Sequence, residues 1–210
     1  MAEKQYFIGI AGNIGSGKSS LTTRLAKNFN FMPYFESVDN NPYLEDFYKD
    51  MSRWSFHLQV YFLSSRFNQQ NQIEKANQSM VMDRTIYEDA EIFARNLNQM
   101  GFLDDRDYKN YVALYEEMTS FLKVPDLLVY LRASVPTLVR QIQQRGRSYE
   151  SSISIDYLEK LNELYEDWVN RYDKGPKLII ETDDLDFVKN EEDLGKILNL
   201  IDQRLFGMFA

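Results

Sequence analysis

The sequence has no cysteine, a single histidine and no long apolar run. Without cysteine, disulfide bonds and thiolate metal sites are excluded, which fits a reducing compartment. The one histidine, His57, has no sequence neighbours that form a catalytic triad or a metal cluster, so we interpret it as a packing or surface residue. No stretch approaches the ~20 apolar residues that span a bilayer, and the N-terminus lacks the basic and apolar regions of a signal peptide. We therefore expect a soluble cytoplasmic protein.

Positive charge is also scarce, because 24 Lys and Arg residues face 32 Asp and Glu residues and leave a net charge of −8. A polyanionic partner would be repelled over most of such a surface, so we expect no nucleic-acid binding. A small phosphate ligand needs only a local basic cluster, which this net charge still allows. The length fits one domain, residues 1–210.

Short apolar runs alternate with longer segments of helical periodicity. Strands are expected at 6–11, 31–38, 79–83, 126–131 and 177–182. Helices are expected at 19–29, 53–70, 88–99, 106–122, 136–144 and 155–172, and after 190. Ser134 and Asn190 are interpreted as helix caps. This alternation predicts a three-layer α/β domain around a five-stranded parallel sheet, with a polar loop at 146–154 as its most mobile part.

The segment GNIGSGKS at 12–19 fits the pattern of a phosphate-binding loop, and it lies between an expected strand and an expected helix. Glycines let backbone N–H groups turn toward phosphate oxygens, and the helix N-terminus adds a positive dipole end. Lys18 can reach the β- and γ-phosphates of a nucleoside triphosphate, and Ser19 can bind Mg²⁺. No guanine-reading NKxD segment is present, which disfavours a GTPase. A kinase, an ATPase and a non-catalytic sensor remain open.

Two carboxylates lie at expected strand ends, where ligands of parallel sheets bind. Glu36 can accept a proton from an attacking hydroxyl group, although a solvated loop carboxylate is the alternative. Asp83 can hold Mg²⁺, and Arg84 can contact phosphate or hold the Glu36 carboxylate. An Asp–Arg structural pair is the alternative for these two residues.

Polar residues elsewhere suggest a lid and a base pocket. Arg145 and Arg147 enter the polar loop and suit a lid over phosphates, although a basic helix end is the alternative. Gln59 lies in a strongly apolar helix, where its amide can contact a base edge, and outward-facing polar positions on a core helix are the alternative.

In combination, the motifs GNIGSGKSS, FESV, YKDMSRWSFHLQ, DRTIYED and RGRSYE resemble the deoxynucleoside kinase family over nearly the whole chain. The similarity is greatest to compact bacterial deoxyadenosine kinases. It implies a P-loop kinase fold with an arginine-bearing lid at about 145–154. It also implies ATP and Mg²⁺ as cofactors, a deoxynucleoside acceptor, and a homodimer formed through the helix at 53–70.

The resemblance also implies roles for individual residues. Catalysis is assigned to Glu36 as the base, with Lys18, Arg84, Arg145 and Arg147. The ATP phosphates are assigned to Gly12, Asn13, Ile14, Gly15, Ser16, Gly17, Lys18, Ser19 and Ser20, and Mg²⁺ to Ser19 and Asp83. The ATP adenine is assigned to the segment with Asp186 and Phe187. The nucleoside is assigned to Tyr48 and Glu150 at the 3′-hydroxyl, Gln59 at the base edge, Arg66 paired with Asp89, Arg84, and Phe93 as a stacking ring.

Three positions depart from the family pattern. Ser37 replaces a proline after the base, Gln141 replaces an arginine four residues before the lid arginine, and Phe62 stands at a position that is small in deoxycytidine kinase. Arg140 lies one residue before Gln141. These departures affect the expected adenine stacking and the shape of the base pocket.

We therefore expect ATP-dependent phosphorylation of a deoxynucleoside 5′-hydroxyl group in nucleotide salvage, with deoxyadenosine as the substrate. Arg66 and Asp89 argue against thymidine. Alternatives are a deoxyguanosine or deoxycytidine kinase, a nucleoside monophosphate kinase, and a non-catalytic ATP sensor. A monophosphate kinase would need basic residues at the acceptor phosphate, where Glu36 would repel it. An end-product triphosphate acting as inhibitor is a further hypothesis.

Overall fold

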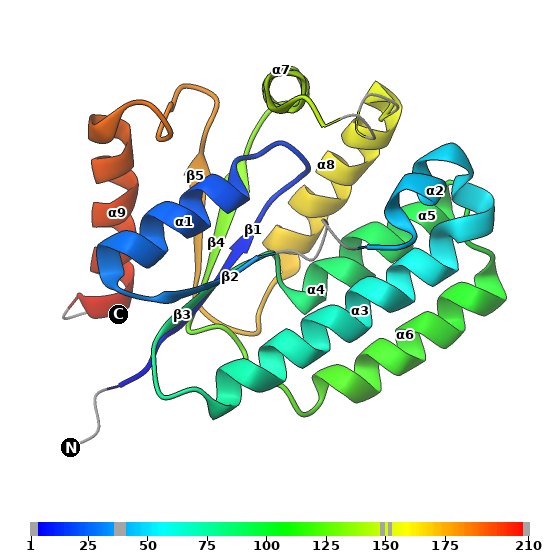
Figure 1. Ribbon diagram of the computed structural model, residues 1–210, viewed down its shortest axis with the longest axis horizontal. Coiled ribbons are helices and arrows are strands. Elements are labelled where there is room, and N and C mark those ends of the chain that lie inside the picture. Colours follow the sequence, from blue (N-terminus) through cyan, green and yellow to red (C-terminus); the bar gives the residue numbers. More distant parts are fainter. Residues whose placement is uncertain (1–3, 36–40, 148–149, 151–152, 208–210) are drawn as a thin grey trace.

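A five-stranded parallel sheet forms the centre of the molecule (Figure 1). The computed structural model describes residues 4–35, 41–147, 150 and 153–207. The strands are β1 (Phe7–Ala11), β2 (Met32–Tyr34), β3 (Met80–Asp83), β4 (Leu127–Arg132) and β5 (Lys177–Glu181), in the order β2-β3-β1-β4-β5. Because β1 lies between β3 and β4, the chain changes direction across the sheet at the carboxyl end of β1, where α/β proteins bind ligands.

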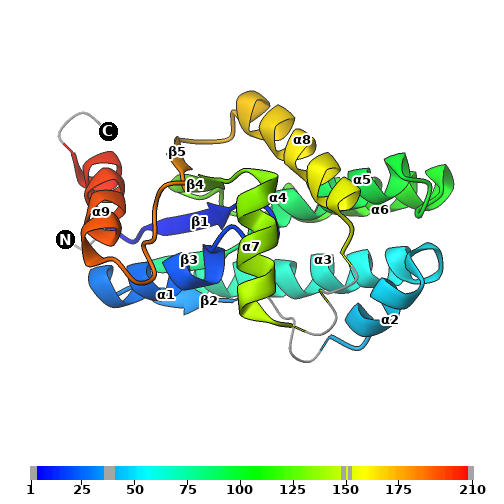
Figure 2. The same cartoon turned by 90° about the horizontal axis from the view of Figure 1, so that it is seen from above.

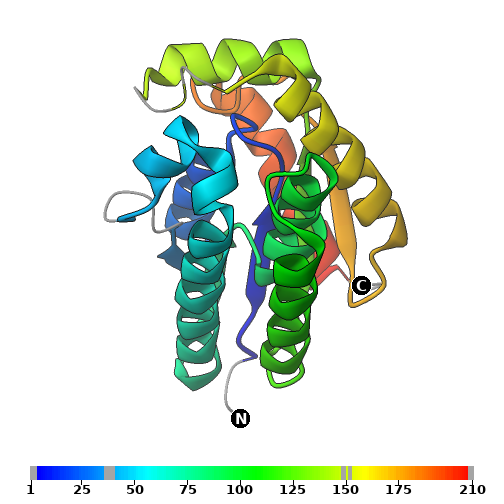
Figure 3. The same cartoon turned by 90° about the vertical axis from the view of Figure 1, so that its right-hand side faces the viewer.

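Helices cover both faces of the sheet (Figures 1 and 3). They are α1 (Lys18–Phe29), α2 (Leu44–Lys49), α3 (Met51–Lys75), α4 (Ile86–Glu88), η1 (Asp89–Ala94), α5 (Arg95–Gln99), α6 (Asp105–Thr119), α7 (Val135–Arg145), α8 (Ile155–Arg171) and α9 (Glu191–Phe206). The helices α1 and α9 lie on one face, and α3, η1 and α8 lie on the other. From above, α7 crosses the carboxyl edge of the sheet (Figure 2). No helix among the described residues is both long and apolar enough to cross a membrane.

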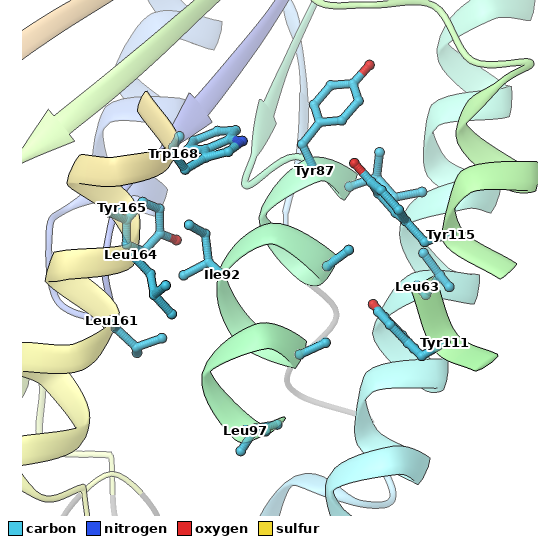
Figure 4. Close-up of a cluster of buried hydrophobic side chains, with 14 of the residues drawn as sticks. Leu63, Tyr87, Ile92, Leu97, Tyr111, Tyr115, Leu161, Leu164, Tyr165 and Trp168 are labelled. Atoms are coloured by element: carbon cyan, nitrogen blue, oxygen red, sulfur yellow. The ribbon is translucent and has the colours of Figure 1, made fainter. Parts of the chain in front are cut away.

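Alternating side chains of the strands divide the core between the two faces. On β4, Val129 faces α1 and α9, whereas Leu128 and Tyr130 face α8 and η1. Figure 4 shows the larger cluster, where side chains of α3, α6, η1 and α8 meet, including Leu63, Ile92, Tyr111, Leu161 and Trp168. The burial of both faces explains why these strands are continuous apolar runs in the sequence.

The helix formed by α4, η1 and α5 contains a π-helical segment at Asp89–Ala94. It starts with a capping box, in which the Thr85 N–H donates to Glu88 at 2.7 Å while the Thr85 side chain caps the Glu88 N–H. A π segment inserts one residue into the α-helical repeat and occurs often at functional sites. The helix predicted at 88–99 is thus present, but it starts earlier and has an irregular centre.

Several predicted boundaries were wrong. The second strand is shorter than the predicted 31–38, and 36–40 lie outside the described residues. The helix predicted at 53–70 extends over Met51–Lys75 and is capped by Asp50, which accepts from the Arg53 N–H at 3.1 Å. The short α2 was not predicted.

The two predicted helix caps have different outcomes. Ser134 occupies the N-cap position of α7, but its hydroxyl donates to Asp183 at 3.0 Å instead of accepting from the helix. Asn190 accepts from the Glu192 N–H at 2.9 Å, as predicted.

Candidate active site

The phosphate-binding loop connects β1 to α1 and lies under α7. Gly15 and Gly17 have φ values of 88° and 93°, which residues with a Cβ atom rarely adopt. A Cβ atom on Gly15 would lie 2.8 Å from the Leu138 carbonyl oxygen of α7, and one on Gly17 would lie 2.7 Å from the ring of Phe187. The glycines therefore permit both the turn and the close packing on either side of it.

The polar residues of the loop contact the loop backbone and the end of β3. Lys18 is buried, and its ammonium group donates to the Asn13 carbonyl oxygen at 2.9 Å. Ser19 donates through its hydroxyl to Asp83 Oδ2 at 2.5 Å, which joins the loop to the end of β3. The sequence-predicted partners Ser19 and Asp83 are thus brought together.

The geometry at Asp83 fits a Mg²⁺ site that is shared with a nucleotide. Its Oδ1 atom is buried and accepts no hydrogen bond from the part of the chain that the structure describes. That part also contains no group of three or more side chains that could hold a metal ion alone. Mg²⁺ in kinases needs only one or two protein ligands, because phosphate and water oxygens complete its shell. Ser19 and Asp83 are sufficient for this arrangement.

Two cavities meet at the phosphate-binding loop. The first has a volume of about 250 Å³ and lies between α2, α3, η1 and the loop. The second has a volume of about 530 Å³ and lies between the loop, α7 and the 183–189 segment. They share Gly15, Lys18, Ser19, Arg145 and Arg147. Two ligands bound in these cavities would therefore both reach the same cationic residues.

The first cavity collects most of the residues assigned to a nucleoside. Its lining includes Tyr48 of α2, Gln59 of α3, Asp89 and Phe93 of η1, and Glu150. Gln59 is buried, and its Oε1 atom has no hydrogen-bond partner among the described residues. An unsatisfied buried acceptor is costly, so this atom is suited to a ligand donor.

The lining also contains residues that the sequence analysis missed, namely Leu44, Phe47, Leu58 and Tyr157. Leu44 and Phe47 belong to α2, whose six residues are too few to show a helical period. Tyr157 lies in the first turn of α8, in a segment that the sequence analysis predicted only as a helix.

Arg66 does not line this cavity, although its partner Asp89 does. The Arg66 Nε atom donates to both Asp89 carboxylate oxygens, at 2.9 and 2.7 Å. Its NH1 group lies 3.4 Å from the Asp83 carbonyl oxygen and 3.3 Å from that of Arg84. Because Arg66 is only 1% exposed, it acts behind Asp89 and fixes the orientation of that carboxylate.

Arg84 reaches the first cavity from a left-handed backbone conformation, with φ of 69°. Its NH1 group donates to the Gly12 carbonyl oxygen at 3.4 Å, to Glu88 Oε1 at 3.3 Å, and to the Tyr165 hydroxyl oxygen. Its guanidinium carbon lies 4.4 Å from the centre of the Phe93 ring. Left-handed conformations of residues other than glycine occur often at functional sites.

The predicted lid arginines are paired with the predicted sugar ligand. Arg145 donates to the Glu150 carboxylate from Nε at 3.0 Å and from NH2 at 2.5 Å, and Arg147 lies 3.5 Å from Glu150 Oε1. Glu150 is buried, whereas both arginines are about one-third exposed. Residues 148–149 and 151–152 lie outside the described part of the chain.

The expected catalytic base, Glu36, also lies outside the described residues, together with Ser37. Phe35, which precedes it, lines the first cavity.

The second cavity contains only part of the segment expected around the ATP adenine. Asp186 lines it, whereas Phe187 is buried beside Gly17 in the core between α1 and α9. Arg140 and Gln141 both line this cavity. The arginine that the family pattern has at 141 is therefore replaced by one that reaches the same cavity from the preceding position.

The chain matches the deoxynucleoside kinase family over residues 8–205. It is 42% identical over 202 residues to the deoxyadenosine/deoxycytidine kinase of Bacillus subtilis (strain 168), which covers 95% of this chain and 92% of that protein. It is 41% identical over 212 residues to the deoxyguanosine kinase of Lactobacillus johnsonii, and the match covers 96% of this chain and 93% of that protein. The structure of deoxyadenosine kinase from M. mycoides with bound dATP matches with a TM-score of 0.84 and 30% identity, covering 94% of this chain and all of that one.

Proposed function

The chain belongs to the deoxynucleoside kinase family, and within it we propose that the enzyme transfers the γ-phosphoryl group of ATP to the 5′-hydroxyl group of deoxyadenosine. The observation that carries this substrate is the buried Gln59 Oε1 atom without a partner in the wall of the first cavity. The relatives named above act on different bases, so the base is argued from the cavity.

The first cavity offers hydrogen-bond acceptors to the base. Gln59 contributes Oε1, and Asp89 contributes a carboxylate that Arg66 orients. Adenine and cytosine carry an exocyclic amino group, whereas guanine and thymine carry a carbonyl oxygen at the equivalent position. Two acceptors that face this position therefore favour an amino group there, as in deoxyadenosine or deoxycytidine, over a carbonyl oxygen. The aromatic rings of Phe62 and Phe93 in the same lining favour the larger stacking surface of adenine.

Phosphoryl transfer would occur where the two cavities meet. The nucleoside 5′-oxygen attacks the γ-phosphorus of ATP, a new P–O bond forms, and the bond to the β-phosphate oxygen breaks to release ADP. Glu36 takes the proton of the 5′-hydroxyl group. Lys18, Arg145 and Arg147, with Arg84 from the nucleoside side, stabilise the negative charge on the transferring group.

Mg²⁺ fits this site through Ser19 and Asp83 and would neutralise charge on the β- and γ-phosphates. The loop from Gly12 to Ser20 surrounds the phosphates, and the second cavity, with Asp186 and Arg140, accommodates the adenosine part of ATP.

Tyr48 and Glu150 are proposed to hold the 3′-hydroxyl group. Both line the first cavity, as Gln59 does. A carboxylate and a phenol can accept from and donate to one hydroxyl group together.

We further propose that dATP inhibits the enzyme by occupying both cavities. The similar M. mycoides protein binds dATP. In this chain, a deoxyadenosine group in the first cavity would place its triphosphate at Lys18 and the lid arginines, which both cavities share. Competition of dATP with both deoxyadenosine and ATP in steady-state assays is expected. The absence of inhibition at millimolar concentration would contradict this proposal.

A homodimer formed through α3 is also proposed. The half-buried rings of Trp54 and Tyr61 on this helix gather with the exposed His57 and with Tyr43, which precedes α2. Sedimentation of the intact chain tests the dimer, and a monomer at micromolar concentration would exclude it. The cytoplasmic location expected from the sequence stays a prediction.

The test of the substrate is ATP- and Mg²⁺-dependent turnover of deoxyadenosine, deoxycytidine, deoxyguanosine, thymidine and their monophosphates. Deoxyinosine is the matched control, because it differs from deoxyadenosine in having a carbonyl oxygen in place of the amino group and a hydrogen on the neighbouring N1 atom. We expect deoxyadenosine to give the highest kcat/KM and deoxyinosine to lose roughly tenfold or more. Faster turnover of deoxyinosine or deoxyguanosine would contradict the proposed base contacts. Glu36→Gln is expected to abolish turnover while ATP binding is retained.

A further inference from the structure

One face of α8 contacts two parts of the reaction centre without lining either cavity. It carries Asn162 and Tyr165, one helical turn apart, and the backbone carbonyl of Leu158. Neither Asn162 nor Tyr165 has a role in the mechanism above. Both nevertheless bond directly to residues that do.

Asn162 holds the phosphate-binding loop. The Asn13 Nδ2 atom donates to Asn162 Oδ1 at 2.7 Å and to the Leu158 carbonyl oxygen at 3.0 Å. Asn162 in turn donates to the Ala133 carbonyl oxygen at 2.9 Å, just after β4. The Asn13 Oδ1 atom accepts from the Ile14 N–H at 2.7 Å. The loop conformation is therefore tied to α8 through one buried side chain.

Tyr165 holds Arg84. Its hydroxyl accepts from Arg84 NH1 and donates to Glu88 Oε1 at 2.8 Å. Glu88 is fully buried, and it also accepts from the Gly12 N–H at 3.3 Å. Burial raises the pKa of the Tyr165 hydroxyl well above its usual value, so the hydroxyl stays protonated and keeps donating to Glu88. The same carboxylate thereby joins Arg84 to the first residue of the phosphate-binding loop.

We propose that Asn162 and Tyr165 are positioning residues for phosphoryl transfer, Asn162 for the phosphate-binding loop and Tyr165 for Arg84. The proposal rests on the proposed function, because it assigns the two contacts to that reaction. Since α8 begins at Ile155, shortly after Glu150, the same helix follows the segment that carries the lid residues. One helix thus fixes the loop and the arginine relative to each other.

The two contacts predict different kinetic effects. Tyr165→Phe keeps the ring but removes the hydroxyl group, so Arg84 loses one of its anchors while ATP contacts are unchanged. A small misplacement of a catalytic group costs about 10- to 100-fold in rate, so kcat should fall by that factor with little change in either KM. Asn162→Ala removes an acceptor from Asn13 and should instead raise the KM for ATP by about tenfold.

Tyr130→Phe is a matched control. Tyr130 is 1% exposed and its ring is stacked on that of Tyr165, with centres 5.7 Å apart. Its hydroxyl donates to Glu166 at 3.0 Å, away from Arg84 and the phosphate-binding loop. The control therefore removes one hydroxyl group from the same aromatic stack without touching either contact of the proposal.

The experiment measures kcat, both KM values, ATP affinity by calorimetry and the thermal unfolding midpoint for the wild type and the three variants. Equal kcat for Tyr165→Phe and Tyr130→Phe, at similar midpoints, would show that Tyr165 is only structural. An unchanged ATP affinity in Asn162→Ala would exclude the role of Asn162. If Tyr165→Phe does not fold, Glu88→Gln tests the anchoring of Arg84 instead, and its ATP affinity is measured alongside because Glu88 also accepts from the Gly12 N–H. Absence of deoxynucleoside turnover in the wild type would contradict the proposed function itself, and the calorimetric comparison would still decide the Asn162 contact.

Discussion

Arg145 and Glu150 form a two-point ion pair beside the place where the two cavities meet. The arginine is assigned to the transferring phosphate, and the carboxylate is assigned to the 3′-hydroxyl group of the sugar. Each residue therefore satisfies the charge of the other. On the roles proposed above, a bound nucleoside would share or replace this pair, which would link occupation of the sugar site to the position of the lid arginine.

The first prediction concerns Glu150 and the sugar. For the wild type, kcat/KM should be lower by about tenfold or more with 2′,3′-dideoxyadenosine than with deoxyadenosine. The reason is that the analogue leaves polar groups of the site unpaired. In Glu150→Ala, the two substrates should be used equally poorly. Glu159→Ala, at an exposed position of α8, is the control and should keep the wild-type ratio. A Glu150→Ala variant that still prefers deoxyadenosine would exclude the 3′-hydroxyl contact.

The second prediction concerns Mg²⁺. Asp83→Asn removes the negative charge beside Ser19, so the Mg²⁺ concentration for half-maximal activity should rise by about tenfold or more. Asp126→Asn is the control. Asp126 accepts from the Phe7 N–H at 2.8 Å, at the amino end of β1 and away from the phosphate-binding loop. Titration of activity with Mg²⁺ at saturating ATP distinguishes the variants. Identical curves for both would contradict a metal role for Asp83.

The third prediction concerns base selection. Asp89→Asn replaces a carboxylate with an amide that can also donate, so the preference for an amino group over a carbonyl oxygen should fall by roughly tenfold. The measured quantity is the ratio of kcat/KM for deoxyadenosine and deoxyinosine. Glu91→Gln, on the same π segment but outside the cavity lining, should leave that ratio unchanged. If both variants keep the wild-type ratio, Asp89 does not contact the base.

The fourth prediction concerns stability. Arg66→Met leaves the Asp89 carboxylate buried without its ion-pair partner and should lower the free energy of unfolding by about 3–5 kcal/mol. Arg24→Met removes an exposed pair with Glu191 and should cost less than about 1 kcal/mol. Urea unfolding at one protein concentration measures both. Equal losses in the free energy of unfolding would show that burial does not increase the cost of removing the partner of Asp89.

The fifth prediction concerns alkaline pH. Burial raises the pKa of Tyr87 to about 12 from the ordinary value of 10.0. The folded state therefore binds this proton more tightly than the unfolded state, so the contribution to stability is complete below pH 10 and is lost as pH rises toward 12. The free energy of unfolding should fall with pH across this window. Tyr87→Phe should make that fall less steep, and an unchanged slope would contradict the assignment.

Family membership and the layered kinase fold were predictable from the sequence and are confirmed. The phosphate-binding loop could be recognised because its glycines and Lys18 are constrained locally, by backbone turn and ligand chemistry. The strands could be recognised because burial on both faces requires continuous apolar residues. The base identity and the roles of individual site residues stay predictions.

Features that depend on tertiary contacts were not predictable. Arg66 was expected beside the base, but the fold places it behind Asp89, since both lie on helices whose packing the sequence pattern does not reveal. Phe187 was expected beside the ATP adenine and instead packs against Gly17. Asn162 and Tyr165 were not singled out, because the sequence pattern around a polar residue on an apolar helix face is the same whether or not that residue contacts a loop.

The π segment Asp89–Ala94 makes the proposed base pocket, the first cavity, sensitive to chain length rather than to composition alone. Its extra residue rotates Asp89 and Phe93 about the helix axis relative to the helical turns on either side. A deletion of one residue here would restore a regular α-helix and rotate the remaining side chains by about 100° relative to the preceding turn. Directed evolution of base preference in this enzyme should therefore succeed with point substitutions in this segment and fail with insertions or deletions.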